Sequence, residues 1–262
     1  MELSDRQFER YARHLILDEV GEVGQAKLLA ARVLVIGAGG LGAPALMYLA
    51  AAGIGTIGVV DFDVVDLSNL QRQIVHRVDR LGESKVESAI DCLAGINPEI
   101  RVIPHQLRLT AANALDLIGE YDLVVDGSDN FPTRYLVNDA CYLAKKTLVA
   151  AALLRFEGQL STFKAHLGDG PCYRCVFREP PPRDLIPRCE EAGILGSVAG
   201  VMGTLQATEA IKEILGLGES LSGKLLLYDA LNTEIRRIKI KRDPGCPLCG
   251  PQATIHDLSA HP

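Results

Sequence analysis

The sequence predicts a single-domain α/β protein in which a mixed, largely parallel sheet is flanked by helices. Short β-branched runs at residues 33–36, 59–60 and 121–126 alternate with segments rich in helix formers, as in βαβ units. The 262 residues can bury one sizeable core, and 48% apolar with 23% charged residues is ordinary for a globular protein. The chain contains no internal repeat and no linker long enough to separate two domains.

The stretch from Val33 to Asp63, VLVIGAGGLGAPALMYLAAAGIGTIGVVDFD, predicts a strand, a glycine turn, a helix and a second strand. Gly37, Gly39 and Gly42 have the spacing G-x-G-x-x-G of a Rossmann-like phosphate-binding turn. Such glycines let a phosphate approach the backbone, and the N-terminus of the following helix favours negative charge there. We expect Asp61, at the end of the second strand, to accept hydrogen bonds from ribose hydroxyls.

Two other interpretations of this stretch compete. The segment from Val33 to Val60 carries no charge, so a hydropathy scan could take it for a membrane span. The glycines at 53, 55 and 58 interrupt it before a second β-branched run, which favours a buried βαβ unit. The second interpretation is an NAD-dependent dehydrogenase, because the fingerprint indicates a nucleotide without saying which one.

The remaining elements follow in chain order. Ser4 and Gln7 predict a capping box for a helix to about Leu15, and with a short helix over 24–30 this makes a helical arm of residues 1–30. Further helices are expected at 85–96, from a Thr110 cap to Gly119, at 131–145 and at 196–215. Further strands are expected at 100–103, 121–126 and 147–153, then an antiparallel or edge strand at 155–163 and a hairpin at 224–228 and 234–240.

The segment between these strands and the last long helix is crowded with proline and charge. Three consecutive prolines at 180–182 exclude helix and strand, so we expect an extended, mobile crossover loop over about 176–195. Cys189 lies in this loop between Arg188 and Glu190, with Arg183 close in sequence. A cationic neighbour can lower a thiol pKa and make it nucleophilic, so a reactive thiol and an exposed thiol without function are both open.

Two C-x-x-C pairs are the strongest local signal. Four thiolates in paired knuckles match a closed tetrahedral zinc site, which is structural because it leaves no open position, and the alternative is two unrelated buried pairs. The four ligands would be Cys172, Cys175, Cys246 and Cys249. The other helical cysteines, Cys92 and Cys141, fit packing positions. The N-terminus has no apolar core of an export signal, so we expect a cytoplasmic protein whose seven cysteines stay reduced.

The turn DGSDN follows a predicted buried strand and carries Asp126 and Asp129. Ligands of open α/β sheets gather at that edge, and a carboxylate there can hold Mg²⁺ bound to triphosphate. Asp129 is the better candidate, because Asp126 also fits a strand end. A net charge of −6 argues against nucleic acid as the main partner, so a phosphate ligand needs local cations. Arg72 and Lys85 supply them and favour ATP over NAD, whereas Arg77 and Arg80 fit surface positions.

The combination of GAGGLG, DFDVVDLSNLQRQ, Lys85, DGSDN, GQLSTF, the two C-x-x-C pairs and CEEAG resembles the MoeB/ThiF family, bacterial relatives of the ubiquitin-activating enzymes. The match runs from about Leu3 to Cys249 and is nearest to the MoeB type. It implies an adenylyltransferase that uses ATP, Mg²⁺ and a structural Zn²⁺. The implied substrate is the C-terminal glycine of a small ubiquitin-like sulfur-carrier protein, activated for thiocarboxylate formation. Molybdopterin, thiamin, tRNA thiolation and amino-acid synthesis all stay open as pathways.

The resemblance also implies roles for single residues. Arg13 would reach the ATP of a partner subunit, which implies a homodimer, and Cys189 matches a loop cysteine that bonds covalently in some relatives only. Residues 33–153 would form the nucleotide-binding half, 154–249 the carrier-binding half and 250–262 a tail. The implied nucleotide-binding residues are Gly37, Gly39, Gly40, Gly42, Asp61, Asp63, Asn69, Arg72, Lys85, Asp129 and Asn130. Some relatives add a rhodanese domain, so here we expect a separate sulfur donor such as a cysteine desulfurase or a rhodanese.

Three rival functions remain at this point. A tRNA-modifying dehydratase of the same superfamily activates a carboxylate on a nucleoside, but the four paired cysteines and the acidic balance count against it. An NAD-dependent oxidoreductase needs neither a divalent ion nor the cations at 72 and 85. A non-catalytic module that docks a ubiquitin-like partner would fit degenerate nucleotide motifs, and these motifs look intact.

Overall fold

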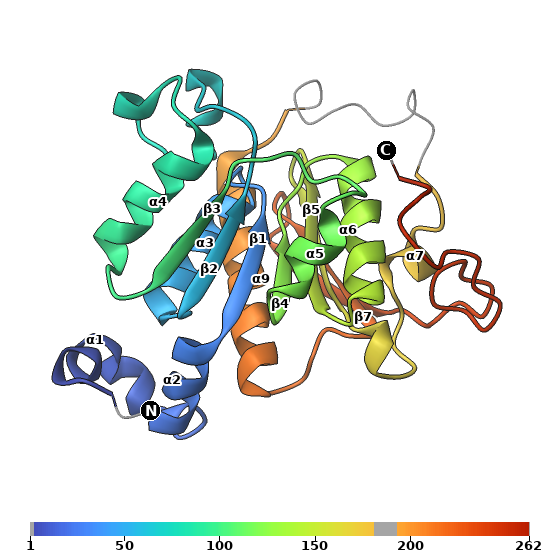
Figure 1. Cartoon of the computed structure of the whole chain (residues 1–262), viewed down its shortest axis with the longest axis horizontal. Helices are drawn as coiled ribbons and strands as arrows, with labels where there is room; N and C mark the ends of the chain where they lie inside the picture. The colour runs from blue at the N-terminus through green and yellow to red at the C-terminus, as the bar shows by residue number, and fades with distance from the viewer. Residues whose placement is uncertain (1–2, 181–192, 262) are drawn as a thin grey trace.

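The computed structural model describes residues 3–180 and 193–261. An eight-stranded sheet crosses the molecule in the order β3-β2-β1-β4-β5-β6-β7-β8 (Figure 1). Its first five strands in that order are parallel and the last three are antiparallel, which confirms the mixed, largely parallel sheet. The strands are β1 (Arg32–Ile36), β2 (Thr56–Val60), β3 (Arg101–His105), β4 (Leu123–Asp126), β5 (Thr147–Leu154), β6 (Glu157–Phe163), β7 (Lys224–Asp229) and β8 (Glu234–Lys239).

Helices cover both faces of the parallel half. On one face α3 (Gly42–Ala52), α4 (Lys85–Ile96) and α9 (Gly196–Leu215) pack, and on the other α5 (Ala114–Gly119) and α6 (Phe131–Leu143). In β1, Val33 and Val35 enter the first core while Leu34 and Ile36 enter the second. A strand buried on both faces has to be apolar at every position, which is why its sequence reads as a continuous β-branched run.

The N-terminal arm consists of α1 (Asp5–Leu15) and α2 (Gly21–Ala30). The predicted capping box is present, because the Ser4 hydroxyl accepts from the Gln7 N–H and the Gln7 side chain accepts from the Ser4 N–H. The arm is fixed to the body by Tyr11, which is 2% exposed and accepts a hydrogen bond of 2.9 Å from the Asn97 amide. The arm therefore lies at the amino ends of the parallel strands (Figure 1).

The prediction that Thr110 caps a helix is wrong. Helix α5 begins at Ala114, and Asn113 instead holds the preceding residues in a loop. Its side-chain oxygen accepts from the Thr110 N–H at 2.9 Å and its amide donates to the Arg108 carbonyl at 3.1 Å. Asparagine competes for local backbone groups in this way, so the loop after β3 stays non-helical and reaches the carboxyl edge of the sheet.

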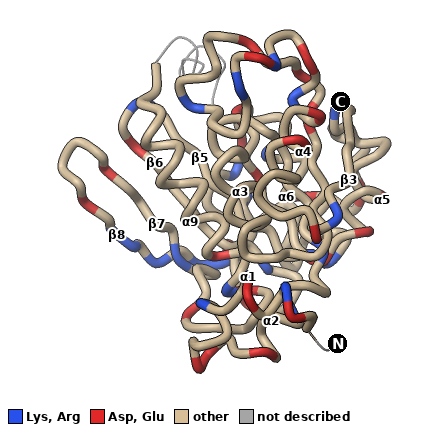
Figure 2. The backbone as a smooth tube through the Cα atoms, turned by 90° about the vertical axis from the view of Figure 1, so that its left-hand side faces the viewer, with Lys and Arg blue, Asp and Glu red and all other residues tan. Residues whose placement is uncertain are grey.

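The antiparallel half ends in an exposed hairpin. Strand β6 is antiparallel, as its alternating sequence predicts, but it lies inside the sheet between β5 and β7 rather than at an edge. The edge strand is β8, whose six residues are all exposed. Its basic side chains, with those that follow, give this corner a concentration of positive charge in an otherwise acidic chain (Figure 2).

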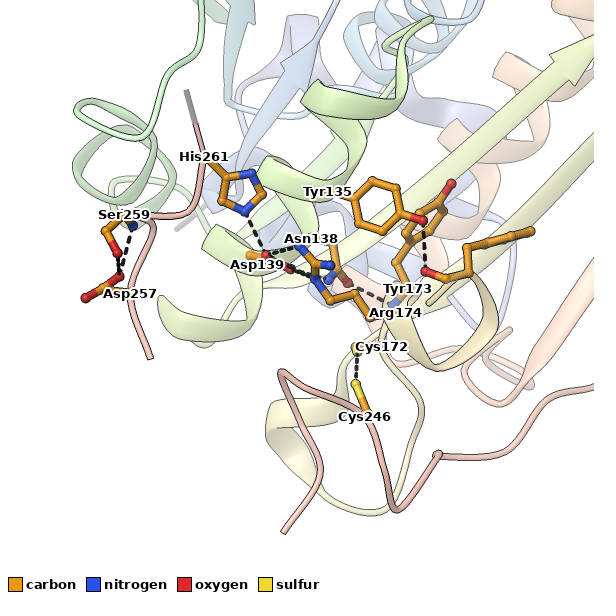
Figure 3. Close-up of polar contacts among 11 residues, drawn as sticks. Tyr135, Asn138, Asp139, Cys172, Tyr173, Arg174, Cys246, Asp257, Ser259 and His261 are labelled. Atoms are coloured by element: carbon orange, nitrogen blue, oxygen red, sulfur yellow. Dashed lines mark hydrogen bonds and ion pairs between the residues drawn. The ribbon is translucent and has the colours of Figure 1, made fainter. Parts of the chain in front are cut away.

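The C-terminal residues return to α6. Leu258 is 4% exposed in the second core, and the His261 ring lies 2.8 Å from the Asp139 carboxylate (Figure 3). The ends of the crossover segment are also held: α7 (Tyr173–Val176) precedes it, and Ile194 forms a bridge to Arg155. Residues 181–192, including Arg183 and the candidate thiol Cys189, lie outside the described residues. Within 3–180 and 193–261, no helix is both long and apolar enough to cross a membrane.

Candidate functional site

A cavity of about 490 Å³ opens at the carboxyl ends of β1, β2 and β4. Its size is in the range of small-molecule sites, and it lies where open α/β sheets bind their ligands. The walls are the glycine turn after β1, the loop after β2, residues 107–110 after β3 and the turn 127–130 after β4. Leu153 of β5 and Ile194, which precedes α9, add a further wall. The cavity therefore joins segments that are far apart in the sequence.

The glycines of the turn divide into two groups. Gly37 has a φ of +89°, and a Cβ on Gly42 would lie 1.8 Å from the Gly37 carbonyl oxygen, so this pair allows the turn to form at all. A Cβ on Gly39 would meet only the Gln73 amide, at 3.6 Å. Gly37, Gly39 and Gly40 line the cavity, whereas Gly42 lies behind the turn. Gly42 serves the packing of the turn and does not face the cavity.

Asp61, Asp63 and Lys85 form a connected group on the second wall. One Asp61 oxygen accepts from the Ala38 N–H of the glycine turn at 2.8 Å, and the other accepts from the Asp63 N–H at 2.9 Å. The Lys85 ammonium lies 3.0 Å from the Asp63 carboxylate, with the lysine only 5% exposed. Asp61 thus braces the turn while lining the cavity, and Lys85 is the first residue of α4, whose N-terminus also favours an anion.

Arg72 lines the cavity beside Gly40, its Cγ 3.5 Å from the place that a Cβ on Gly40 would take. Its guanidinium donates to the Ser68 carbonyl at 3.2 Å and has no ion pair with a carboxylate among the described residues. Asn69 does not line the cavity, and its amide donates to the Ser68 hydroxyl at 3.0 Å. Its expected phosphate contact stays a prediction.

The two aspartates after β4 have different surroundings. Asp126 is 1% exposed and accepts from the Ser128 N–H at 2.9 Å, and burial raises the pKa of its carboxyl group. Asp129 is exposed and lines the cavity. Asn130 caps α6 by accepting from the Thr133 N–H at 2.9 Å and lines the cavity as well. Asp129 is therefore the carboxylate of this turn that a cation in the cavity can reach.

Two arginines in the cavity wall were not predicted from the sequence. The Arg108 guanidinium lies 4.0 Å from the centre of the Phe62 ring. Arg134 is 7% exposed and donates to the carbonyls of Ala151 and Ser128. The charged lining residues are Arg72, Lys85, Arg108 and Arg134 against Asp61, Asp63 and Asp129, so the cavity carries an excess of positive charge. By contrast, Arg77 and Arg80 form surface ion pairs, as predicted.

The four cysteines of the two C-x-x-C pairs form a cluster. Their sulfur atoms all lie within 4.8 Å of one another. The Sγ–Sγ distance is 3.8 Å between Cys172 and Cys175, 3.5 Å between Cys172 and Cys246, and 3.4 Å between Cys175 and Cys249. Tetrahedral zinc with Zn–S bonds of about 2.3 Å places sulfur atoms about 3.8 Å apart, so the donor set and spacing fit Zn²⁺. Hydrogen bonding from Cys172 lowers the pKa of Cys246 and favours its thiolate. None of the four lines the cavity.

Arg13 does not reach the cavity of its own chain. It is exposed on α1, at the amino ends of the strands, while the cavity opens at the carboxyl ends (Figure 1). The structure thus brings together the expected nucleotide-binding residues, except Gly42 and Asn69, and leaves Arg13 at the opposite end of the sheet.

Comparison with known proteins decides the family. The profile of the ThiF family matches residues 11–248. The chain belongs to the ThiF family. It is 56% identical to the probable adenylyltransferase/sulfurtransferase MoeZ of Mycobacterium tuberculosis over 94% of this chain and 63% of that protein. It is 48% identical to the sulfur carrier protein adenylyltransferase of Thermus thermophilus over 98% of this chain and 96% of that protein.

Some similar proteins are longer than this chain. An adenylyltransferase and sulfurtransferase of Bos taurus is 52% identical over 98% of this chain, which spans 56% of that protein's length. A solved structure of E. coli MccB with MccA-N7isoASN superposes with a TM-score of 0.80 at 25% identity, over 95% of this chain and 76% of that one. The ThiF family fold and the resemblance to the MoeB/ThiF family are confirmed.

Proposed function

We propose that this protein adenylates the C-terminal glycine of a small ubiquitin-like sulfur-carrier protein, with ATP as the donor. The observation that carries this proposal is the cavity, which combines an open glycine turn, a reachable carboxylate at Asp129 and two cations, Arg72 and Lys85, on its walls. The names of relatives at 48% and 56% identity support the same activity. Molybdopterin and thiamin synthesis are the pathways that we propose first.

The chemistry fits the residues present. A carboxylate oxygen of the carrier attacks the α-phosphorus of ATP, an O–P bond forms, and the bond from that phosphorus to the bridging oxygen breaks. Pyrophosphate leaves with the electron pair, and the carrier holds an acyl-adenylate. Oxide is a very poor leaving group and AMP is a good one, so adenylation prepares the carbonyl for a sulfur nucleophile. The protein needs no nucleophile of its own, only positioning and positive charge around the departing pyrophosphate.

Asp129 is the residue that we propose for Mg²⁺. The other two cavity aspartates are engaged, Asp61 by two backbone N–H groups and Asp63 by Lys85. Among the residues that the structure describes, Asp129 receives only a long contact of 3.4 Å from Asn130, which leaves oxygen positions for a cation. Carboxylate and phosphate oxygens together are the ligands that Mg²⁺ prefers, and the ion would neutralise charge on the phosphates.

We further propose that Zn²⁺ fills the cysteine cluster and that the C-terminal half receives the carrier. The exposed β7–β8 hairpin presents Leu231, Ile235 and Ile238, which are 70%, 55% and 45% exposed. Exposed apolar side chains beside basic ones are typical of a protein-binding surface. We also propose a separate sulfur donor in the cytoplasm, a cysteine desulfurase or a rhodanese.

A homodimer with shared sites is also proposed. The molecule has one exposed apolar surface on the N-terminal arm and another along the loop after β2. The two surfaces lie at opposite ends of the molecule, and the surface of the loop lies beside the cavity. A two-fold dimer that pairs the first surface with the second would bring Arg13 to the partner's cavity. The arm surface is Phe8, Ile16, Leu17 and Val23, and the loop surface is Val64, Leu67, Ile74, Val78 and Leu81, with exposures between 39% and 74%.

The dimer proposal has a complementation test. Arg13→Ala and Asp129→Ala would each inactivate both sites of their own homodimer. Mixed and re-paired subunits would regain about a quarter of the wild-type sites, because half of the random pairs are heterodimers with one intact site. Recovery of no activity in a demonstrated heterodimer would refute the shared site.

The function itself is tested by carrier-dependent exchange of labelled pyrophosphate into ATP. We expect exchange only with a ubiquitin-like protein that ends in Gly-Gly, and its loss on Asp129→Ala or Arg72→Ala with folding intact. Exchange that survives both substitutions would refute the site assignment. Activity on tRNA without a carrier would favour the dehydratase, and NADH binding unaffected by ATP and Mg²⁺ would favour an oxidoreductase.

A further inference from the structure

Gln73 is a buried side chain whose amide has no hydrogen bond among the described residues. It is 5% exposed, lines the cavity, and its side-chain oxygen has neither a partner nor contact with solvent. The amide nitrogen lies beside Gly39, 3.6 Å from the place that a Cβ on that glycine would take. The nitrogen end thus faces the part of the cavity next to the glycine turn.

The other buried amides of the described chain are satisfied at least in part. Gln25 donates to the Ala52 carbonyl at 3.0 Å and its oxygen pairs with the His14 ring. Asn97, Asn138 and Gln206 each form at least one side-chain hydrogen bond. A buried polar group without a partner costs about 1–3 kcal/mol, so proteins keep one where a ligand or water completes it. Gln73 stands out from this set because neither end of its amide has a partner among the described residues, and its nitrogen end is the one that lies beside the cavity turn.

The backbone that carries Gln73 is held rigidly. The Gln73 N–H donates to the Asn69 carbonyl at 3.0 Å, and the Gln73 carbonyl accepts from the His76 N–H at 3.0 Å. The buried His76 ring then ties this segment to the turn, with Nε2 2.9 Å from the Ala38 carbonyl oxygen and Nδ1 2.9 Å from the Ser88 hydroxyl. A carbonyl can only accept, so Nε2 donates. The backbone that carries the amide is thereby held beside the turn before any ligand binds.

A second unpaired group lies near the same turn. Ser128 is 8% exposed, lines the cavity and has a buried hydroxyl without a partner. Its backbone nitrogen is 3.6 Å from the place that a Cβ on Gly37 would take. That N–H already donates to the Asp126 carboxylate, so the side chains left beside the turn are the Gln73 amide next to Gly39 and Arg72 next to Gly40. Preorganised donors of this kind stabilise charge that develops on a reacting group.

We propose that the Gln73 amide donates a hydrogen bond to the phosphoryl group under attack. This inference rests on the proposed function, because it presupposes transfer at the α-phosphorus of ATP. As the carboxylate oxygen adds and the pyrophosphate oxygen leaves, negative charge shifts among the phosphoryl oxygens, and the amide N–H stabilises it there. Because this contact strengthens in the transition state, Gln73 contributes to the rate of adenylation far more than to ATP affinity.

The test compares Gln73→Met and Gln73→Glu with the wild type. Methionine keeps the length of the side chain without its hydrogen bonds, and glutamate keeps the shape without the donor. The control is Gln71→Met, an exposed neighbour that does not line the cavity. The readouts are single-turnover formation of the acyl-adenylate at saturating ATP, the ATP dissociation constant by calorimetry, and the unfolding temperature.

Both Gln73 variants should form the acyl-adenylate about 100-fold more slowly, as when one oxyanion donor is lost. The ATP dissociation constant of the neutral Gln73→Met variant should stay within about threefold of the wild type, whereas the added charge of Gln73→Glu should also weaken ATP binding. Gln73→Met should also unfold at a higher temperature, since it removes an unpaired buried amide, and a merely structural role predicts the reverse. A Gln73→Met rate within about twofold of wild type, or equal losses in rate and affinity, would overturn the inference alone. A wild type that adenylates no carrier would overturn the proposed function as well.

Discussion

The cysteine cluster and the cavity both gather polar side chains from distant segments, but they differ in how those groups are satisfied. In the cluster, four thiols contact one another within 4.8 Å and leave no open position. In the cavity, the Gln73 oxygen and the Ser128 hydroxyl have no partner, and Arg72 has no carboxylate among the described residues. A saturated cluster can only stabilise the chain, whereas the Gln73 amide and Arg72 leave the cavity lined with groups that a ligand can engage.

This difference predicts two classes of variant. Substitutions in the cluster and its supports should lower the free energy of unfolding and affect activity only through the fold. Substitutions of unsatisfied cavity groups should lower activity and leave stability unchanged or improved. The predictions below run from the largest expected effect to the smallest.

Cys246→Ser should have the largest effect on stability. It removes one of the four thiols, so zinc should be lost and the free energy of unfolding should fall by more than about 4 kcal/mol. Zinc content by mass spectrometry and urea denaturation measure both quantities. The matched control is Cys92→Ser, a half-buried cysteine outside the cluster, which should keep its zinc. Full zinc content in Cys246→Ser would contradict the assignment of the cluster.

Asp139→Asn should weaken the support of the cluster. The Asp139 carboxylate is fully buried and accepts from Arg174, at 2.7 and 2.8 Å, and from His261 at 2.8 Å (Figure 3). Burial would raise its pKa, but these hydrogen bonds lower it. Loss of the charge should cost about 3 kcal/mol, because Arg174 is left without an anion. The folded variant should bind ATP as the wild type does, and a large loss of ATP affinity would break the distinction between the two regions.

The glycine turn contains both classes within a few residues. A Cβ on Gly42 would lie 1.8 Å from the Gly37 carbonyl oxygen, so Gly42→Ala should destabilise the fold by about 2–3 kcal/mol. A Cβ on Gly39 would contact only the amide nitrogen of Gln73, so Gly39→Ala should change the free energy of unfolding by less than about 0.5 kcal/mol. The same substitution should weaken ATP binding. Denaturation and calorimetry on both variants test this. Equal destabilisation by Gly42→Ala and Gly39→Ala would show that the two glycines do not have separate structural and ligand-binding roles.

His76→Gln should have the smallest effect, visible in the pH dependence of stability. Burial, with the nearby Lys85, lowers the pKa of His76 from 6.5, although the Ala38 hydrogen bond and Asp61 oppose this. As the pH falls through 6.5, the unfolded chain binds a proton that the folded chain does not, so the free energy of unfolding declines. Glutamine does not titrate, so the variant should lose less stability than the wild type below this pH. Parallel pH profiles would contradict the role of the neutral ring.

Local sequence signals predicted most of the fold. β1 was predicted because its residues are buried on both faces and therefore apolar without interruption. The bounds of α9 were predicted correctly, since the largely apolar segment from Gly196 to Leu215 has no internal proline. The start of α5 was missed because Asn113 binds the backbone of Thr110, and side-chain competition of that kind is weakly encoded in residue type.

The site was predictable only where a local motif carries the chemistry. The glycine turn, Asp61 and Asp129 each occupy a fixed place at a strand end, so their positions could be inferred. Arg108 enters the cavity because β3 lies two strands from β1, and that strand order has no signature in residues 101–110. Gln73 stands next to Arg72 in the sequence, but burial without a partner is a property of the folded chain alone.

The central claim is that the cavity activates a carboxylate at the α-phosphorus of ATP, while the cysteine cluster takes no part in the reaction. The most direct measurement is intact-mass spectrometry of a Gly-Gly-ended ubiquitin-like carrier, labelled with ¹⁸O in its terminal carboxylate, after incubation with the protein, ATP and Mg²⁺. We predict a carrier that gains one AMP at its C-terminus and, after hydrolysis, AMP that contains one ¹⁸O. A carrier that gains a single phosphoryl group, or AMP without the label, would contradict the claim.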